Sequence, residues 1–257
     1  MKRLLLLIAL LIIGCAPEEK VIYPNEQGVP YIIHPDELTD SGTPKDGIPT
    51  IDNPVFIKEA PWLRDDAQVI ALEYKGVKRV YPLQIIVWHQ IVNDNIKEKP
   101  VIITYSALTG SAAAYETVSQ FGSTGKLYNS ELVIFDRLTG SFWLNGKAII
   151  GDATGDKLKP IDVDVVKWLD WKTKNPEVLS AQTGYRRNYD RDPYIDYYKE
   201  DYVLFPVKQE DKRMHAKTVI FGIGVNGVFK AYKDEDIKVG KTYDTVNGNK
   251  IKINTGN

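Results

Sequence analysis

The residues most able to do chemistry lie in two short stretches in the middle of the chain. Ser106 in the second stretch could act as a nucleophile if His89 in the first served as its base, with Asp94 or Asp136 orienting the imidazole ring. However, Tyr105-Ser106-Ala107 lacks the glycine-flanked turn that exposes the serine in one large class of hydrolases. A buried Ser106 hydroxyl bonded to nearby backbone groups is therefore the alternative. The candidate cleft comprises His89, Asn93, Asp94, Tyr105, Ser106, Thr109 and Lys126.

His89 belongs either to a site or to the core. It follows Trp88 in an apolar stretch, where a core histidine would bond a backbone carbonyl through one ring nitrogen. A weak, oxygen-rich metal site that includes Asp94 is the other possibility. The remaining histidines, His34 and His215, are far away in the sequence, so the chain has no zinc motif. We predict neither a metal nor a cofactor.

The stretch from Phe121 to Lys126 resembles part of a phosphate-binding loop. The full motif is absent, since Gln120 occupies the position of its first glycine and Leu127 that of the residue that would hold magnesium. We therefore expect a pair of turns, with Lys126 lining a surface cleft.

The fold that positions these residues is expected to consist mostly of strands. Residues 69–81 carry β-branched and aromatic residues on both sides of Lys75-Gly76, which predicts a hairpin with a tight turn. Apolar spacing predicts a short helix over 83–92 and a second over 163–174. The other expected elements are strands at 101–105, 112–118 and 131–137 and a hairpin at 141–150 turning at Asn145-Gly146. The fold class is thus α+β and β-rich: a single domain of hairpins and mixed sheet with a few short helices.

Part of this pattern occurs twice. Residues 219–232 repeat the pattern of residues 69–81. Gly227 aligns with Gly76, Tyr232 with Tyr81 and Ile237 with Ile86, each at an offset of 151. We interpret this as a possible internal duplication of a hairpin, which could place the two hairpins side by side.

The N-terminus has the order of an export signal. Lys2 and Arg3 precede an apolar run over 4–13, which is shorter than the roughly 20 residues of a membrane-spanning helix. The run ends at Gly14-Cys15, which resembles a bacterial lipobox with the cysteine as the lipid-modified residue. We expect a signal peptide over 1–14, a lipidated Cys15 with a Pro-rich tether over 15–46, and one globular domain over 47–257. The Pro-rich segment could equally pack as an extended arm along the domain.

Composition narrows the class of protein. Cys15 is the chain's single cysteine, so the mature domain has no disulfide, thiolate metal site or thiol nucleophile. Without Lys2 and Arg3, 31 basic residues face 34 acidic ones, a net charge near −3 with no basic block, which predicts no nucleic-acid partner.

Two central segments carry a family resemblance. Trp88-His89-Gln90-Ile91-Val92-Asn93-Asp94 and Thr104-Tyr105-Ser106-Ala107-Leu108-Thr109-Gly110-Ser111-Ala112 resemble the W-H-E-I-V-N-D and T-Y-C-P-L-C-G-T-A patterns of an uncharacterised prokaryotic family, domain of unknown function 3179. The resemblance extends from about Asp46 to Tyr232. The family's paired cysteines fall on Ser106 and Thr109, and its glutamate falls on Gln90. Hydroxyl groups replace thiols poorly in metal binding or redox cycling, so the resemblance implies a retained scaffold with a degenerate thiol site.

These observations predict an exported lipoprotein, anchored through Cys15 in the cell membrane or the outer membrane and facing away from the cytoplasm. Its expected role is that of a scaffold that binds an unknown small ligand or an envelope protein. The alternative is a metal-dependent redox enzyme or a hydrolase centred on His89, which would require His89, Ser106 and Thr109 to converge within bonding distance.

Overall fold

The computed structural model describes residues 24–233 and 240–255. The predicted signal peptide and Cys15 lie outside these residues, as does Ile237 of the proposed repeat.

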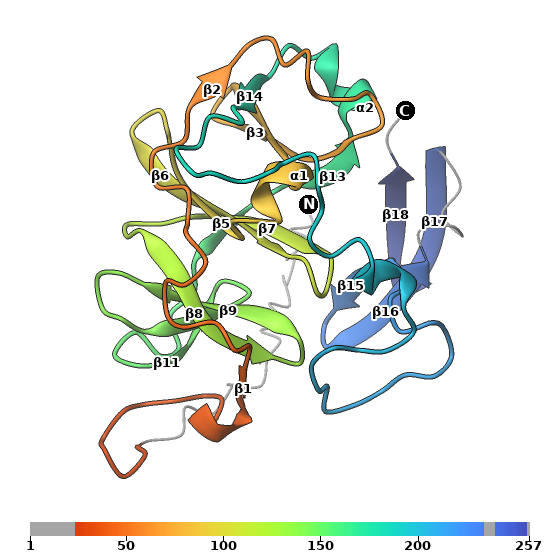
Figure 1. The fold of residues 1–257 in the computed structure, drawn as a ribbon. Coiled ribbons are helices and arrows are strands. Elements are labelled where there is room, and N and C mark those ends of the chain that lie inside the picture. Colours follow the sequence, from red (N-terminus) through yellow and green to blue (C-terminus); the bar gives the residue numbers. More distant parts are fainter. Residues whose placement is uncertain (1–23, 234–239, 256–257) are drawn as a thin grey trace, which may run out of the picture.

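Three sheets build the main body, which confirms the β-rich α+β class (Figure 1). The first has the order β1-β8-β9-β10-β11, from β1 (Thr39–Asp40), β8 (Phe121–Tyr128), β9 (Glu131–Asp136), β10 (Phe142–Leu144) and β11 (Lys147–Ile150). The second has the order β12-β7-β6-β5, from β12 (Lys159–Ile161), β7 (Ser111–Glu116), β6 (Lys99–Ser106) and β5 (Ile91–Ile96). The third has the order β13-β3-β4-β14-β2, from β13 (Asp164–Lys167), β3 (Gln68–Tyr74), β4 (Val77–Pro82), β14 (Glu177–Leu179) and β2 (Phe56–Ile57). Short helical segments complete this part of the chain: η1 (Pro35–Glu37), α1 (Leu83–Ile86), α2 (Trp168–Lys172) and η2 (Tyr197–Lys199).

The second sheet is the middle layer of the body. On β6, Val101 and Ile103 pack with β3 and β4 of the third sheet, whereas Ile102 packs with β8 and β9 of the first. Alternate side chains of one strand thus enter two different cores, as the period of two requires. Burial on both faces of β6 explains why residues 101–105 form a continuous apolar run instead of an alternating pattern.

The predicted hairpins at 69–81 and 141–150 are confirmed as β3–β4 and β10–β11. Both turn through two residues with positive φ, Lys75-Gly76 and Asn145-Gly146. Two-residue turns of this kind match the twist of the strands that they join.

The two predicted helices are shorter than expected. Helix α1 ends at Ile86, and after Gln90, which has a φ of 61°, the chain enters β5. Asn93 and Asp94, which directly follow the helix expected at 83–92, are therefore strand residues. The prediction was wrong here because a short apolar run fits a buried strand as well as a helix. The second helix is reduced to α2 because residues 164–167 pair with β3, although Trp168 and Trp171 do pack together against that strand.

The described part of the Pro-rich segment is a packed arm. Tyr31 bridges Ile150, and Thr39 and Asp40 pair with β8 as strand β1. At Gly125 of β8 the arm comes so close that a Cβ atom would lie 1.8 Å from the Thr43 carbonyl oxygen. Of the two interpretations of this segment, the extended arm fits the described part.

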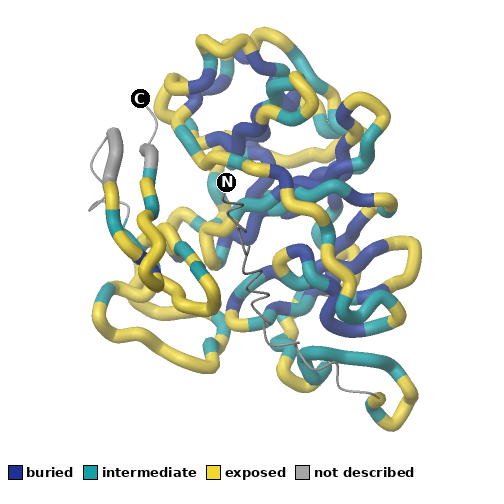
Figure 2. The backbone as a smooth tube through the Cα atoms, turned by 180° about the vertical axis from the view of Figure 1, so that it is seen from behind, coloured by how far each residue is buried: buried dark blue, intermediate teal, exposed yellow. Residues whose placement is uncertain are grey.

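The second copy of the repeat also forms a hairpin, from β15 (Ile220–Val225) and β16 (Val228–Lys233). A further hairpin follows, from β17 (Gly240–Val246) and β18 (Asn249–Thr255). Within the described residues each is a two-stranded sheet of its own, so the matching hairpins β3–β4 and β15–β16 do not share a sheet. Figure 2 shows this C-terminal part as mostly exposed, in contrast to the buried central layers.

Candidate functional site

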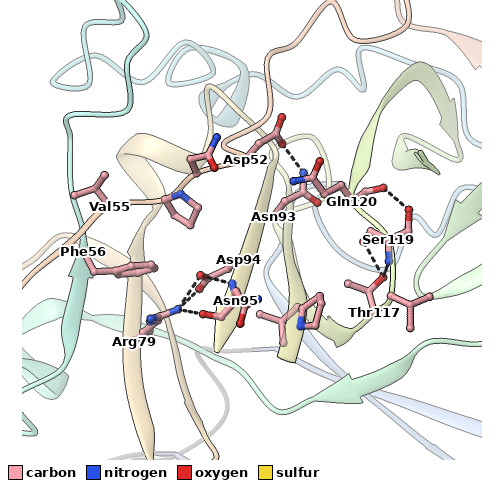
Figure 3. A pocket seen from close by; sticks show the side chains of 15 residues that line it. Asp52, Val55, Phe56, Arg79, Asn93, Asp94, Asn95, Thr117, Ser119 and Gln120 are labelled. Carbon is pink, nitrogen blue, oxygen red and sulfur yellow. Dashed lines mark hydrogen bonds and ion pairs between the residues drawn. The ribbon is translucent and has the colours of Figure 1, made fainter. Parts of the chain in front are cut away.

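A pocket of about 610 Å³ opens beside β5. In Figure 3, the segment that leads into β2 and the loop after β7 lie on opposite sides of Asn93, Asp94 and Asn95. We call this cavity the Asn93 pocket. Its lining residues are Asp52, Asn53, Pro54, Val55, Phe56, Arg79, Asn93, Asp94, Asn95, Pro100, Val101, Thr117, Val118, Ser119 and Gln120.

Asn93 joins two layers of the fold at the pocket wall. Its carboxamide donates to the Phe121 carbonyl at 2.9 Å and accepts from the Phe121 N–H at 2.8 Å, which ties β5 to β8. It also donates to Asp52 Oδ1 at 2.6 Å, and the same oxygen accepts from the Thr50 hydroxyl. Because the oxygen and the nitrogen of the Asn93 carboxamide are both engaged, its role is to hold Asp52 in place at the pocket.

Asp94 is the centre of a buried ionic cluster. Both of its oxygens lie 2.7 Å from Arg79 Nη1, and they also accept from the Tyr81 hydroxyl and the Asn95 N–H, each at 2.6 Å. Arg79 donates through Nε to Glu177 at 3.0 Å. Burial lowers the pKa of Arg79, but the charge of Asp94 and the bonds to both carboxylates outweigh it, so the pKa is raised overall. Burial also raises the pKa of Tyr81 strongly, which keeps its hydroxyl a proton donor.

His89 lies in the core and not in the Asn93 pocket. Its side chain is fully buried, with Nδ1 2.7 Å from the Pro49 carbonyl oxygen and Nε2 2.7 Å from the Tyr189 hydroxyl. A carbonyl only accepts, so Nδ1 carries the proton and Nε2 accepts from Tyr189, whose hydroxyl also contacts Thr183. Burial, reinforced by Arg187, lowers the pKa of His89 despite the bond to Pro49. The carbonyl bond expected of a core histidine is present.

Ser106 and Thr109 belong to a separate hydroxyl cluster around Glu131. The Thr109 hydroxyl lies 2.6 Å from Glu131 Oε2, and the Ser111 hydroxyl lies within hydrogen-bond distance of both carboxylate oxygens. Ser106 and Glu131 line a small cavity of about 20 Å³ together. Burial raises the pKa of Glu131, and bonds from Thr109, Ser111 and Ser106 partly oppose this effect. The Glu131 carboxylate thus accepts hydrogen bonds from Ser106 and Thr109, the two residues that align with the cysteines of the family pattern.

The expected single cleft is therefore divided. Asn93 and Asp94 line the pocket, Tyr105 packs in the core with His89's neighbours, and Lys126 forms an ion pair with Asp40 of the arm at 2.8 Å. Both ring nitrogens of His89 bond to Pro49 and Tyr189, so the nucleophile and base arrangement with Ser106 is not formed. The correction has a physical origin: Lys126 lies on β8 of the first sheet and Ser106 on β6 of the second, and His89, in the turn before β5, has both ring nitrogens engaged elsewhere.

Sequence reasoning missed several residues of these clusters, namely Asp52, Arg79, Gln120, Glu131 and Tyr189. The bonds that Asp52, Arg79, Glu131 and Tyr189 make to Asn93, Asp94, Thr109 and His89 span 15 to 100 residues of the chain. The Gln120 side chain has no hydrogen-bond partner among the described residues. One signal was available: the polar run Asn93-Asp94-Asn95 follows directly on apolar residues, which also fits a strand that ends at a polar pocket.

Neither a cluster of potential metal ligands nor a membrane-crossing helix occurs in residues 24–233 and 240–255. These residues contain no group of three His, Cys, Asp or Glu side chains placed to hold a metal ion. They also contain no helix long and apolar enough to cross a membrane.

Fold and pocket together define a layered β-rich domain with a polar cavity at the edge of its middle sheet. The chain belongs to the family described as Protein of unknown function (DUF3179), which matches residues 45–256. No curated protein and no solved structure matches the chain.

Proposed function

We propose that this protein is an exported lipoprotein that binds a small polar ligand in the Asn93 pocket. The lipid on Cys15 would hold it at a membrane, on the side away from the cytoplasm. The His89 and Ser106 positions then serve as retained scaffold and not as a reaction centre.

The anchor rests on the N-terminal sequence. Two cationic residues, an apolar run of moderate length and Gly14-Cys15 stand in the order of a lipoprotein signal. Cys15 is the chain's single cysteine, which leaves it free of any disulfide partner within the protein.

One observation carries the binding role: the wall of the Asn93 pocket is fixed before any ligand arrives. Asn93 has its hydrogen bonds satisfied by Phe121 and Asp52, and Asp94 has its bonds satisfied by Arg79 and Tyr81. A preformed wall lowers the entropy cost of binding. The volume of about 610 Å³ falls within the range typical of small-molecule sites, about 300–1,000 Å³.

Membrane fractionation of cells that produce the wild type and Cys15→Ser tests the anchor. We expect the wild type to incorporate a labelled fatty acid and to stay in the membrane fraction, and Cys15→Ser to lose the label. A labelled Cys15→Ser protein, or an unlabelled wild type, would contradict the anchor.

A pocket-filling variant tests the binding role without knowledge of the ligand. Gln120 is exposed at the pocket, so Gln120→Trp is expected to fill the cavity and leave the core intact. Gln209→Trp places the same ring on an exposed surface residue elsewhere. In a thermal-shift screen of polar metabolites, we expect at least one compound to raise the Tm of the wild type and Gln209→Trp but not of Gln120→Trp. A screen in which no shift depends on Gln120 would contradict the binding role.

A further inference from the structure

We infer that the ligand of the Asn93 pocket is an uncharged polyhydroxylated molecule, a sugar or a polyol; this inference rests on the proposed binding role. Three features of the pocket support this inference: polar side chains without a hydrogen-bond partner, a cation whose charge is already paired, and apolar lining residues.

The available hydrogen-bonding groups are carboxamides. Asn53, Asn95 and Gln120 are exposed at the pocket, and within the described residues their side chains make no hydrogen bond. A carboxamide presents an acceptor and two donors side by side, and a hydroxyl group both donates and accepts. Three such groups around one cavity therefore match a ligand with several hydroxyls.

One carboxylate adds an acceptor to this set. Asp52 Oδ1 is used by Thr50 and Asn93, whereas Oδ2 has no hydrogen-bond partner among the described residues. Asn93 and Thr50 fix the orientation of the carboxylate, so Oδ2 is presented in a constant position. Hydrogen bonds from hydroxyls to a carboxylate are stronger than those between neutral groups.

The charge of the cationic side chain in the pocket is already paired with two carboxylates. Arg79 Nη1 donates to Asp94 and to the Asn95 carbonyl, and Nε donates to Glu177. Among the lining residues, Asp52 and Asp94 oppose Arg79, which gives the wall a net charge of −1. Phosphorylated or carboxylated ligands would meet an acidic wall with a neutralised arginine, which disfavours them.

Apolar side chains on two sides of the pocket complete the match. Pro54, Phe56 and Pro100 line it, as do Val55 and Val118, which are 54% and 85% exposed. A sugar ring carries hydroxyls around its edge and C–H groups on its faces. The C–H faces bury apolar area against these side chains while the edge hydroxyls reach the carboxamides.

Calorimetric titration of the mature lipoprotein tests the inference. The protein is kept in a detergent without a sugar headgroup, because a maltoside or glucoside would compete. The probes are glucose, galactose, N-acetylglucosamine, maltose and mannitol, with glucuronate, glucose 6-phosphate and glucosamine as charged counterparts. We expect at least one neutral probe to bind, and the anionic probes glucuronate and glucose 6-phosphate to bind at least tenfold more weakly.

The double variant Asn95→Ala/Gln120→Ala is expected to weaken that binding by tenfold or more, while Gln209→Ala binds like the wild type. Tighter binding of glucosamine or of an anionic probe would overturn the inference. So would a neutral probe whose affinity is the same in the double variant. If no neutral probe binds but a screened metabolite shows a Gln120-dependent shift, the sugar class is wrong and the binding role stands. If the screen also fails, both are wrong.

Discussion

Tyr81 donates its hydroxyl proton to Asp94 at 2.6 Å, and the same contact recurs between Tyr232 and Asp244 at 2.9 Å. Two residues before each tyrosine stands a cation that binds the same carboxylate, Arg79 in one case and Lys230 in the other. Each aspartate also accepts from the backbone N–H of the next residue at 2.6 Å. The repeat therefore extends beyond one hairpin, to the pairs β3–β4 with β5–β6 and β15–β16 with β17–β18.

The second copy shows what this contact does by itself. Asp244 has the tyrosine, the cation and the backbone bond, yet Tyr243 stands where the first copy has Asn93. The cluster around the aspartate thus holds one hairpin against the next in both copies. On the proposed binding role, ligand recognition in the first copy is left to Asp52, which Asn93 orients, and to the exposed carboxamides.

The two aspartates should differ in their contribution to stability. Asp94→Asn removes the charge that neutralises a largely buried Arg79, and breaking such a pair costs about 3 kcal/mol. Asp244→Asn breaks the same kinds of bond at a partly exposed position, where the aspartate side chain is 32% accessible against 3% for Asp94. Solvent screens the loss there, so a much smaller change is expected. Urea denaturation of both variants measures the difference. Equal losses would show that burial does not distinguish the two copies.

Glu131→Gln should stabilise the protein at neutral pH. Burial raises the folded-state pKa of Glu131 above the unfolded value of about 4.3, so the charged form is the disfavoured one in the fold. Wild-type stability from this group is present below the unfolded pKa and is lost as the pH rises through the folded pKa. The variant should therefore have the higher Tm at pH 7.5, and the difference should vanish near pH 4.

Glu59→Gln is the control for this series, because Glu59 is exposed and removed from the hydroxyl cluster. A Glu131→Gln protein that is less stable than the wild type at pH 7.5 would mean that the hydroxyl bonds outweigh burial.

The strands were predictable because their signals are local. Val101 to Tyr105 is a continuous apolar run, and Asn145-Gly146 specifies its turn without help from the rest of the fold. The ends of the helices were not predictable. The start of β5 has a spacing of apolar residues that also fits a helix, and it is the pairing of β5 with β6 that makes this segment a strand.

The clusters were the least predictable part. Asn93 and Asp94 were identified from their types, but their partners Asp52 and Arg79 come from other strands and loops. His89 was identified as a candidate site residue, but its surroundings could not be predicted. Tyr189 lies 100 residues away in the chain, and its hydroxyl bonds to Nε2 of His89, the nitrogen that a catalytic base would need.

Gly125 should be intolerant of any side chain. Its φ of +72° disfavours L-residues, and a Cβ atom would lie 1.8 Å from the Thr43 carbonyl oxygen of the arm. Gly140 has a similar φ of +74°, but a Cβ atom there would meet no other atom within 4 Å, so Gly140→Ala isolates the backbone strain, about 1 kcal/mol. We expect Gly125→Ala to lose at least about 2 kcal/mol in denaturant melts, because the arm must also move. Equal losses in the two variants would mean that the arm is not held on β8.

His89 should make the stability of the protein depend on pH below neutrality. Its pKa is lowered in the fold by burial, so the unfolded chain takes up a proton first, from its ordinary value of about 6.5 downward. The contribution of a group with a depressed pKa is present above the unfolded value and is lost as the pH falls toward the folded value. His89→Gln retains a donor for Pro49 and an acceptor for Tyr189, and it should cost about 1 kcal/mol at pH 8. Because the glutamine does not titrate, the gap between wild type and variant should narrow from pH 7 to pH 5. Urea melts across that range measure the gap, and a gap that stays constant would show that the fold does not lower the pKa of His89.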